Sequence, residues 1–353
     1  MPQQLVAFDA GHLNTRGTDV ALFDYAHFNE TLLGNRSVIL CPARADLAAL
    51  DRFRQRFSVL LYRDAADLAT LLGDVDVYYH IAEGSRPKTP LLRPRNGRVV
   101  VHCVFRADQP HGDIYASVSD WVSTHYGPPA GTVPVPVVPH IVRLPDLDDD
   151  LRDTLRIPRT ATVFGRHGGF DTFDLEFAQE AVRRIAHERT DAWFVFLGTR
   201  PFCDHERVVF LPATTDPAEK TVFINTCDAM LHARAEGETF GLAVAEFSIR
   251  NKPVITWLEG KDNYHVEVLG RKGIYYRTPA DLDRILSVFR PIQGELDVYS
   301  VRFSPEAVMA RFQAVFLEPA DRSLPSRPPL ALDQAGSYPY ASAKSPAPMR
   351  RAK

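Results

Sequence analysis

Two glutamates, Glu238 and Glu246, lie eight positions apart in ARAEGETFGLAVAEFSIRNKPVI, residues 233–255, and the residues between them and just after them are largely apolar. A buried carboxylate without a partner costs several kcal/mol, so an Ala-, Val- and Phe-rich helix does not carry one as a by-product of packing. A solvated helix face is the alternative, but the run LAVAEFSI is too apolar for it. We therefore expect polar groups to meet both carboxylates.

The residues between the two glutamates predict an anion site. Phe240 and Gly241 are expected to end a turn, with a helix beginning directly after them. The first N–H groups of a helix lack partners within it, and the helix dipole is positive at that end. Because Gly241 has no side chain, a phosphate could approach the backbone there. Glu246, on the second turn, could accept hydrogen bonds from two vicinal hydroxyls, and a ribose is the natural candidate.

The pattern Glu-x-Phe-Gly-x4-Glu, followed by Lys-Pro-Val-Ile, resembles the donor-site motif of retaining glycosyltransferases of the GT-B fold, as in glycosyltransferase family 4. The resemblance includes the Gly-Arg of VFGRHGGFD, residues 163–171, and covers roughly residues 160 to 260. It implies an α/β fold with two Rossmann-like domains that face each other across a cleft. The nucleotide sugar would lie mainly on the second domain and the acceptor on the first.

Applied residue by residue, the resemblance implies a role for each part of the motif. Glu246 would hold the ribose, and Glu238 would hold hydroxyls of the transferred sugar. Arg166 would neutralise the diphosphate, whose charge grows as the sugar leaves, so no metal ion would be needed. Backbone N–H groups of three neighbours would contact the diphosphate and the sugar: Phe240, Gly241 and Leu242.

One position departs from the family pattern. The family usually has a lysine about five residues after the arginine, whereas this chain has Asp171. Gly165 and Gly168 flank the arginine in the expected phosphate loop, and Gly169 could add a backbone amide. Arg200, after the next strand, could supply the second positive charge. Without the glutamate motif, the Gly-Arg would suggest only a surface arginine at a strand end.

The first half of the chain holds further polar residues at strand ends. The loop 10–19 joins the first strand to the first helix, where the family has a glycine-containing loop facing the cleft. Several of its residues could contact the donor phosphate or the acceptor, although the last could instead cap the helix: His12, Asn14, Arg16, Gly17 and Thr18. His102 ends a strand at the edge where α/β folds bind ligands, and we expect it in the catalytic cleft. His80 and His111 have similar positions, and each histidine could instead be structural.

Two α/β units must position these residues. Apolar β-rich runs alternate with helical patterns between residues 5 and 105, which is typical of a parallel sheet covered on both faces. A Pro-rich and acidic stretch, 127–150, indicates a crossing between domains, after which the alternation restarts. A helix is expected over 303–316. The expected units are an acceptor domain, a nucleotide-sugar domain and a disordered Pro-rich tail: residues 1–142, 143–317 and 318–353.

Composition narrows the function classes. With 353 residues, 45% of them hydrophobic, and a net charge of -3, the chain has core material for two domains and no basic footprint for nucleic acid. No stretch approaches the roughly 18 apolar residues of a membrane span, and we expect a cytoplasmic protein. The four scattered cysteines are expected to be free thiols: Cys41, Cys103, Cys203 and Cys227. The acidic pair Asp74 and Asp76 and the run 146–150 are weak candidates for metal ligands.

The predicted function is transfer of a sugar from a nucleotide diphosphate sugar, a UDP- or GDP-sugar, to a hydroxyl of a glycan or small molecule. The resemblance implies that the anomeric configuration is retained and that no cofactor is used. Two alternatives remain open. One is a nucleotide-sugar epimerase or hydrolase on the same fold. The other is a catalytically degenerate nucleotide-binding protein, which the missing lysine suggests.

Overall fold

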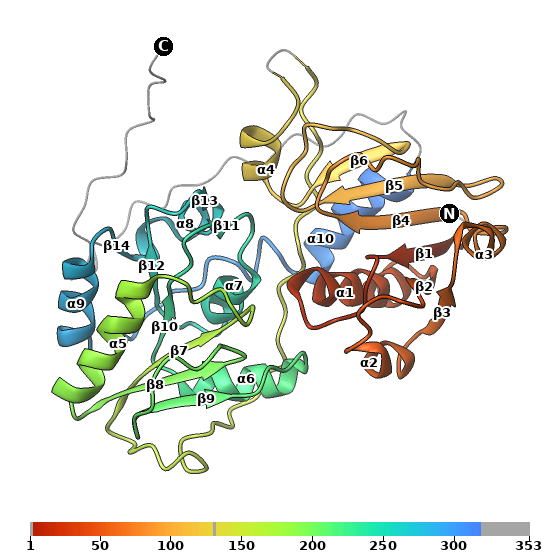
Figure 1. Cartoon of the computed structure of the whole chain (residues 1–353). Coiled ribbons are helices and arrows are strands. Elements are labelled where there is room, and N and C mark those ends of the chain that lie inside the picture. The colour runs from red at the N-terminus through yellow and green to blue at the C-terminus, as the bar shows by residue number, and fades with distance from the viewer. Residues whose placement is uncertain (1–2, 130–131, 319–353) are drawn as a thin grey trace.

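Two six-stranded parallel sheets form the framework of the computed structural model, which describes residues 3–129 and 132–318 (Figure 1). The first sheet has the strand order β3-β2-β1-β4-β5-β6, and the second has β14-β12-β10-β7-β8-β9. The two orders are equivalent. If the strands of the second sheet are numbered along the chain from β7 and the sheet is read from β9 to β14, its order is also third, second, first, fourth, fifth, sixth. Strand order therefore reverses beside β1 in one sheet and beside β7 in the other, and ligands bind at such switch points. The expected pair of Rossmann-like units is confirmed.

The first unit forms where the sequence has continuous apolar runs. Its strands are β1 (Leu5–Asp9), β2 (Arg36–Pro42), β3 (Ser58–Tyr62), β4 (Val77–Ala82), β5 (Arg98–Cys103) and β6 (Ile114–Ser117). Its helices are α1 (Gly17–Thr31), α2 (Leu50–Arg54), α3 (Ala65–Leu71) and α4 (Asp120–His125). Val6, Ala7 and Phe8 of the central strand are fully buried, as a sheet covered on both faces requires. The helix before β3, α2, has only five residues.

The second unit repeats this architecture. Its strands are β7 (Thr162–His167), β8 (Ala192–Leu197), β9 (Val208–Leu211), β10 (Ala229–His232), β12 (Val254–Trp257) and β14 (Ile274–Tyr276). Its helices are α5 (Glu176–Glu188), α6 (Pro217–Thr226), α7 (Leu242–Ile249), α8 (Tyr264–Leu269), the 3-10 turn η1 (Gly270–Lys272) and α9 (Pro279–Val288). A separate two-stranded sheet pairs β11 (Gly237–Glu238) with β13 (Asp262–Asn263). Ala178, Val182 and Ile185 form the buried stripe of α5 that their spacing predicts.

The chain crosses between the two sheets twice. On the way out, the backbone N–H of Val142 donates to the carbonyl oxygen of Phe303 on the way back, at 2.9 Å. The returning chain forms α10 (Pro305–Phe312) and the π-helical turn η2 (Gln313–Leu317), which lie against the first sheet (Figure 1). Phe312 packs against the rings of Phe8, Tyr25 and Tyr79. These residues, which the sequence analysis included in the second domain, therefore pack with the first.

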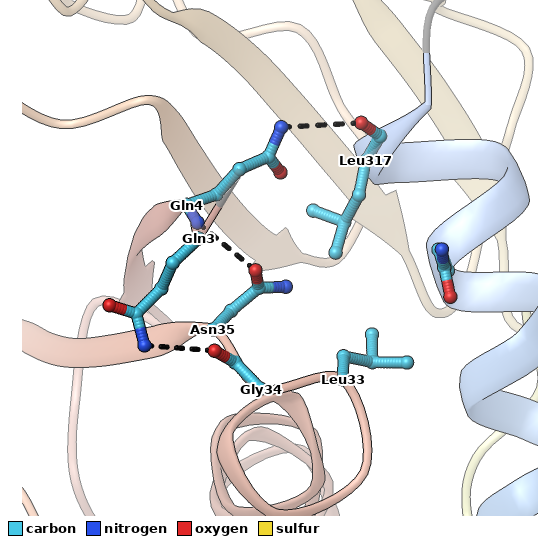
Figure 2. A pocket seen from close by; sticks show the side chains of 7 residues that line it. Gln3, Gln4, Leu33, Gly34, Asn35 and Leu317 are labelled. Carbon is cyan, nitrogen blue, oxygen red and sulfur yellow. Dashed lines mark hydrogen bonds between the residues drawn. The ribbon is translucent and has the colours of Figure 1, made fainter. Parts of the chain in front are cut away.

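Figure 2 shows the seam that the returning chain makes with the start of β1. The side chain of Gln4 donates to the carbonyl oxygen of Leu317 at 3.5 Å, and its backbone N–H donates to Asn35 Oδ1 at 3.0 Å. The expected Pro-rich tail lies outside the described residues beyond residue 318. Within the described ranges, no helix combines the length and the apolar character needed to cross a bilayer. All four cysteines are free thiols, as expected.

Candidate functional site

The turn between the two glutamates requires glycine. Gly241 is the N-cap of α7 and has a φ of 85°, in the left-handed region that glycine tolerates best. A Cβ atom at this position would lie 3.2 Å from Cβ of Glu238 and 3.3 Å from Cβ of His265. The chain therefore passes close to Glu238 before Leu242 begins the helix. As the motif suggested, Glu238 lies before the N-terminus of α7 and Glu246 lies inside the helix.

Glu246 is 4% exposed and lies between two basic side chains. Nζ of Lys220, on α6, donates to Oε1. Nε2 of His167, at the end of β7, lies 3.0 Å from Oε2 in a close contact that is not an aligned hydrogen bond. Burial alone would raise the pKa of Glu246. The charge of Lys220 and the contact with His167 have the opposite effect and together outweigh burial, so the pKa is lowered to about 2. Glu246 is therefore an ionised acceptor at neutral pH.

Glu238 is held by a second group of basic side chains. Nε2 of His232 lies 3.3 Å from Oε1, and Arg234 donates to Oε2 at 2.9 Å. Burial raises the pKa of Glu238, whereas the hydrogen bond from His232 and the charge of Arg234 bring it down to about 2. Behind His232, Thr256 Oγ1 bridges Nδ1 of His232 at 2.8 Å and Nε2 of His265 at 2.9 Å. The carboxylate is thus ionised and held in one orientation.

Arg166 is 3% exposed at the end of β7, with its guanidinium directed into the loop that follows. It donates to the hydroxyls of Thr199 and Thr172, and at 3.0 Å to the carbonyl oxygen of Gly169. Burial lowers the pKa of Arg166 to about 10, so it stays charged at neutral pH. Gly168 and Gly169 are exposed beside it, with Gly168 at a φ of 149°. Arg166 therefore fixes an exposed glycine loop at the switch point of the second sheet.

Gly165 and Arg200 have neighbours that their positions in the sequence did not indicate. Gly165 lies inside β7, where a Cβ atom would fall 2.1 Å from Sγ of Cys227, so this glycine allows α6 to pack closely on the strand. Arg200 lies on the surface, where it forms an ion pair with Asp171. Neither position contacts Glu238 or Glu246 through any interaction of the described residues.

The first unit brings its β1–α1 loop to the second unit. A Cβ atom on Gly17, the first residue of α1, would lie 3.6 Å from Cδ1 of Leu242, the first residue of α7. In the same loop, Nδ1 of His12 lies 3.0 Å from Asp19 Oδ1, and Asp19 is 1% exposed. The hydrogen bond to Asp19 raises the pKa of His12. Two helix N-termini thus meet here, beside a histidine that a carboxylate orients.

Both ring nitrogens of His102 are already hydrogen-bonded, so neither is free to act near the two glutamates. It is fully buried, its Nε2 donates to the carbonyl oxygen of Val138 at 2.8 Å, and its Nδ1 accepts from the hydroxyl of Tyr79 at 2.6 Å. Burial lowers the pKa of His102 to about 4, so the ring is neutral. Its contacts are those of a core histidine, and we do not include it in the proposed reaction.

A small pocket between the two units has Glu246 in its wall. Its walls include residues of α1, α2, α6 and α7: Val20, Asp24, Arg52, Lys220, Leu242 and Glu246. Burial raises the pKa of Asp24 to about 7. The guanidinium of Arg52 lies 4.2 Å over the ring of Phe23. Asp24, Arg52 and Lys220 were not predicted from the sequence, since each acquires its place only through contact between domains or between helices.

Comparisons with known proteins agree with this architecture. No protein-family model matches the chain, and no curated protein matches it in sequence. Among solved structures, HepE of Anabaena in complex with UDP-glucose is 14% identical, with a TM-score of 0.66 over 88% of this chain and 99% of that one. A glycosyltransferase from Rickettsia africae is 13% identical, with a TM-score of 0.58 over 90% of this chain and 95% of that one.

A protein described as a putative UDP-N-acetylglucosamine 2-epimerase, from Listeria monocytogenes, is also similar. It is 12% identical, with a TM-score of 0.53 over 90% of this chain and 98% of that one. At such identities the likeness establishes the fold. The chain has the two-domain GT-B fold of these structures, as the glutamate motif led us to expect.

Proposed function

We propose that this protein is a glycosyltransferase that moves a sugar from a nucleoside diphosphate sugar to a hydroxyl of an acceptor. One observation carries the proposal: two ionised carboxylates, the half-buried Glu238 just before α7 and the buried Glu246 inside it, lie on either side of the helix N-terminus, and Glu246 lines the pocket between the domains. Free N–H groups at a helix N-terminus suit a diphosphate, and carboxylates on either side suit the hydroxyls of a ribose and a sugar. HepE, which shares this fold, forms a complex with UDP-glucose, a donor of the proposed class.

Within this proposal, Glu246 accepts hydrogen bonds from the ribose and Glu238 from the transferred sugar. An ionised carboxylate has about four acceptor positions, so Glu246 can bind hydroxyls while it keeps Lys220 and His167. The N–H groups of Gly241 and Leu242, the Gly168 loop and the charge of Arg166 face the diphosphate. The acceptor binds on the first domain near His12.

We further propose that the anomeric configuration is retained and that no metal ion is needed. Both points rest on the resemblance of the Glu-x-Phe-Gly-x4-Glu motif to that of retaining glycosyltransferases. The bond from the anomeric carbon to the leaving phosphate breaks, and the acceptor oxygen bonds to the same face of that carbon. The acceptor proton passes to an oxygen of the leaving diphosphate. Positive charge on the protein replaces a metal ion, so transfer should persist in EDTA.

The test is product analysis by mass spectrometry and NMR. The protein is incubated with UDP-glucose or GDP-mannose, each with and without a panel of glycan and small-molecule acceptors. The proposal predicts a glycosylated acceptor whose anomeric configuration matches that of the donor. The epimerase-like neighbour motivates the alternative outcome, conversion of the nucleotide sugar without an acceptor. Binding of nucleotides without any turnover would instead identify a degenerate enzyme.

A further inference from the structure

The side chain of Asp262 joins the first domain to β13, the strand that pairs with the strand of Glu238. The indole N–H of Trp121, on α4, donates to Oδ1 of Asp262 at 2.9 Å, and the hydroxyl of Tyr126 donates to the same oxygen at 2.7 Å. Asp262 is 8% exposed and lies on β13 of the second unit. Two hydrogen bonds to one largely buried carboxyl oxygen therefore link the two domains.

Asp262 is also the backbone partner of the residue before Glu238. In the pairing of β11 with β13, Gly237 lies opposite Asp262 and Glu238 lies opposite Asn263. The backbone N–H of Asp262 donates to the carbonyl oxygen of Glu236 at 2.7 Å. A Cβ atom on Gly237 would lie 2.0 Å from the carbonyl oxygen of Asp262, so the two backbones are in close contact. A shift of Asp262 must move the backbone of Glu238 with it.

Both donors are held in place by their own neighbours. The ring of His125 stacks on Trp121 with centroids 3.8 Å apart and an interplanar angle of 22°. Nζ of Lys261 lies 5.5 Å from the ring centroid of Tyr126. The contact with His125 holds Trp121 from within the first domain, and the contact with Lys261 holds Tyr126 from the side of β13. The hydrogen bonds from Trp121 and Tyr126 to Asp262 therefore join α4 and β13 in one defined arrangement.

We propose that Asp262 is a positioning residue for the transfer reaction, which fixes Glu238 against the sugar only while α4 is docked on β13. The inference rests on the proposed function, because it assigns Glu238 to the transferred sugar. The nucleotide is bound by other groups, Glu246 and the N-terminus of α7. Loss of the link should therefore slow the chemical step and leave nucleotide affinity unchanged.

The experiment compares four variants in the full-length protein: Trp121→Phe, Tyr126→Phe, Asp262→Ala and Asp262→Asn. The first two each remove one donor and keep an aromatic ring, whereas the asparagine keeps the Oδ1 acceptor. Tyr115→Phe is the matched control, because it removes a tyrosine hydroxyl that donates to the carbonyl oxygen of Gly84 at 2.7 Å within the first domain. Circular dichroism and thermal unfolding establish that each variant is folded.

Two quantities are measured for each variant. The first is the dissociation constant for UDP or GDP. The second is the single-turnover rate with UDP-glucose or GDP-mannose, in which the acceptor is the one that the product screen identifies or, failing that, water. Each ring variant should transfer about 3- to 10-fold more slowly, and Asp262→Ala about 10- to 100-fold more slowly, at unchanged nucleotide affinity. Asp262→Asn should recover most of the rate, and Tyr115→Phe should match wild type.

The inference is overturned if Asp262→Ala transfers at the wild-type rate, if Asp262→Asn is as slow as Asp262→Ala, or if nucleotide affinity falls in step with the rate. In each of these cases the wild-type protein still binds and transfers, and the proposed function stands. A wild-type protein that binds neither nucleotide and turns over neither donor contradicts the proposed function itself.

Discussion

Asp171 and Arg200 form an ion pair on the surface of the second domain, with Nε and Nη2 of Arg200 2.7 and 2.6 Å from Oδ1 of Asp171. Asp171 occupies the position where the resemblance leads one to expect a lysine. The guanidinium also lies 5.0 Å over the ring of Phe170. The positive charge that Arg200 could offer to a diphosphate is therefore shared with a carboxylate of the same loop that Arg166 anchors.

Asp171→Asn should tighten binding of UDP or GDP by about 2- to 5-fold, because it removes a negative charge beside the proposed diphosphate site. The effect is small since both partners are 65% exposed, and solvent screens such pairs. Calorimetry at low and high salt measures it, and the gain should shrink as salt rises. Glu188→Gln, which breaks the exposed pair with Arg184 on α5, is the control. Equal gains in both variants would show that the loop has no special role.

Lys220→Met should lower the free energy of unfolding by about 3 to 5 kcal/mol, because it leaves Glu246 charged, buried and without its closest partner. The double variant Lys220→Met with Glu246→Gln should recover much of that loss. Urea unfolding at neutral pH gives the coupling between the two sites. Lys272→Met is the control, since that ammonium contacts the carbonyl oxygen of Asp297. Strictly additive losses in the double variant would contradict the ion pair.

His12 should titrate above the ordinary histidine value of 6.5, because the hydrogen bond to Asp19 stabilises its charged form. In Asp19→Asn the pKa should fall below 6.5, since burial and the charge of Arg16 then outweigh the smaller, opposite effect of Asp46. Protonation of His12 therefore adds stability that is full below pH 6.5 while Asp19 is ionised, and this stability is lost as pH rises through the folded-state pKa of His12. Burial raises the pKa of Asp19, so the pair is also weakened at the acidic end, where that carboxyl takes up a proton. NMR titration of the histidines measures this, with His205 as an internal reference that should not change. An unaltered His12 titration in Asp19→Asn rules the pair out.

The sequence predicted the parts of the site that follow from local rules. The buried glutamates and the glycine turn were recognisable because a carboxylate in an apolar helix needs polar partners, and a Phe-Gly pair before such a helix favours a turn. The partners of the glutamates were not recognisable. Lys220 meets Glu246 across two helices, and Arg234 and His232 meet Glu238 across a turn after β10. The Lys220–Glu246 pair depends on tertiary packing, which spacing along one chain does not encode. Arg234 and His232 are close to Glu238 in sequence, and they meet it only because of the turn that the chain makes there.

The fold shows the same division. Continuous apolar runs predicted the parallel sheets, since burial on both faces leaves a strong pattern. The two-residue strands β11 and β13 carry no such pattern, and backbone contact between Gly237 and Asp262 creates them. The return of α10 to the first sheet was also missed, because Phe312 would look equally apolar in either domain. His102 at a strand end looked like a cleft residue, although its ring is directed into the core.

Arg166→Ala and Glu238→Ala should fail in different ways. Arg166 fixes the loop of Gly168 and Gly169, and in the proposed arrangement it stabilises charge on the leaving diphosphate, so its loss should weaken binding of UDP or GDP and also slow transfer. In the same proposal Glu238 contacts only the transferred sugar, so its loss should slow transfer while affinity for the free nucleoside diphosphate stays near wild type. Dissociation constants and single-turnover rates in both folded variants supply the comparison. If Glu238→Ala loses nucleotide affinity as severely as Arg166→Ala, the assignment of the sugar to Glu238 is wrong.

Calorimetric titration of the wild-type protein and Glu246→Gln with UDP and GDP tests the central claim most directly, because Glu246 is the group assigned to the ribose. Loss of hydrogen bonds to a charged acceptor should cost about 1.5 to 3 kcal/mol, which is a roughly 10- to 100-fold weaker dissociation constant. With the corresponding 2′,3′-dideoxynucleoside diphosphate, wild type and Glu246→Gln should bind equally weakly. A folded Glu246→Gln protein that binds UDP and GDP as tightly as wild type would contradict the placement of the donor.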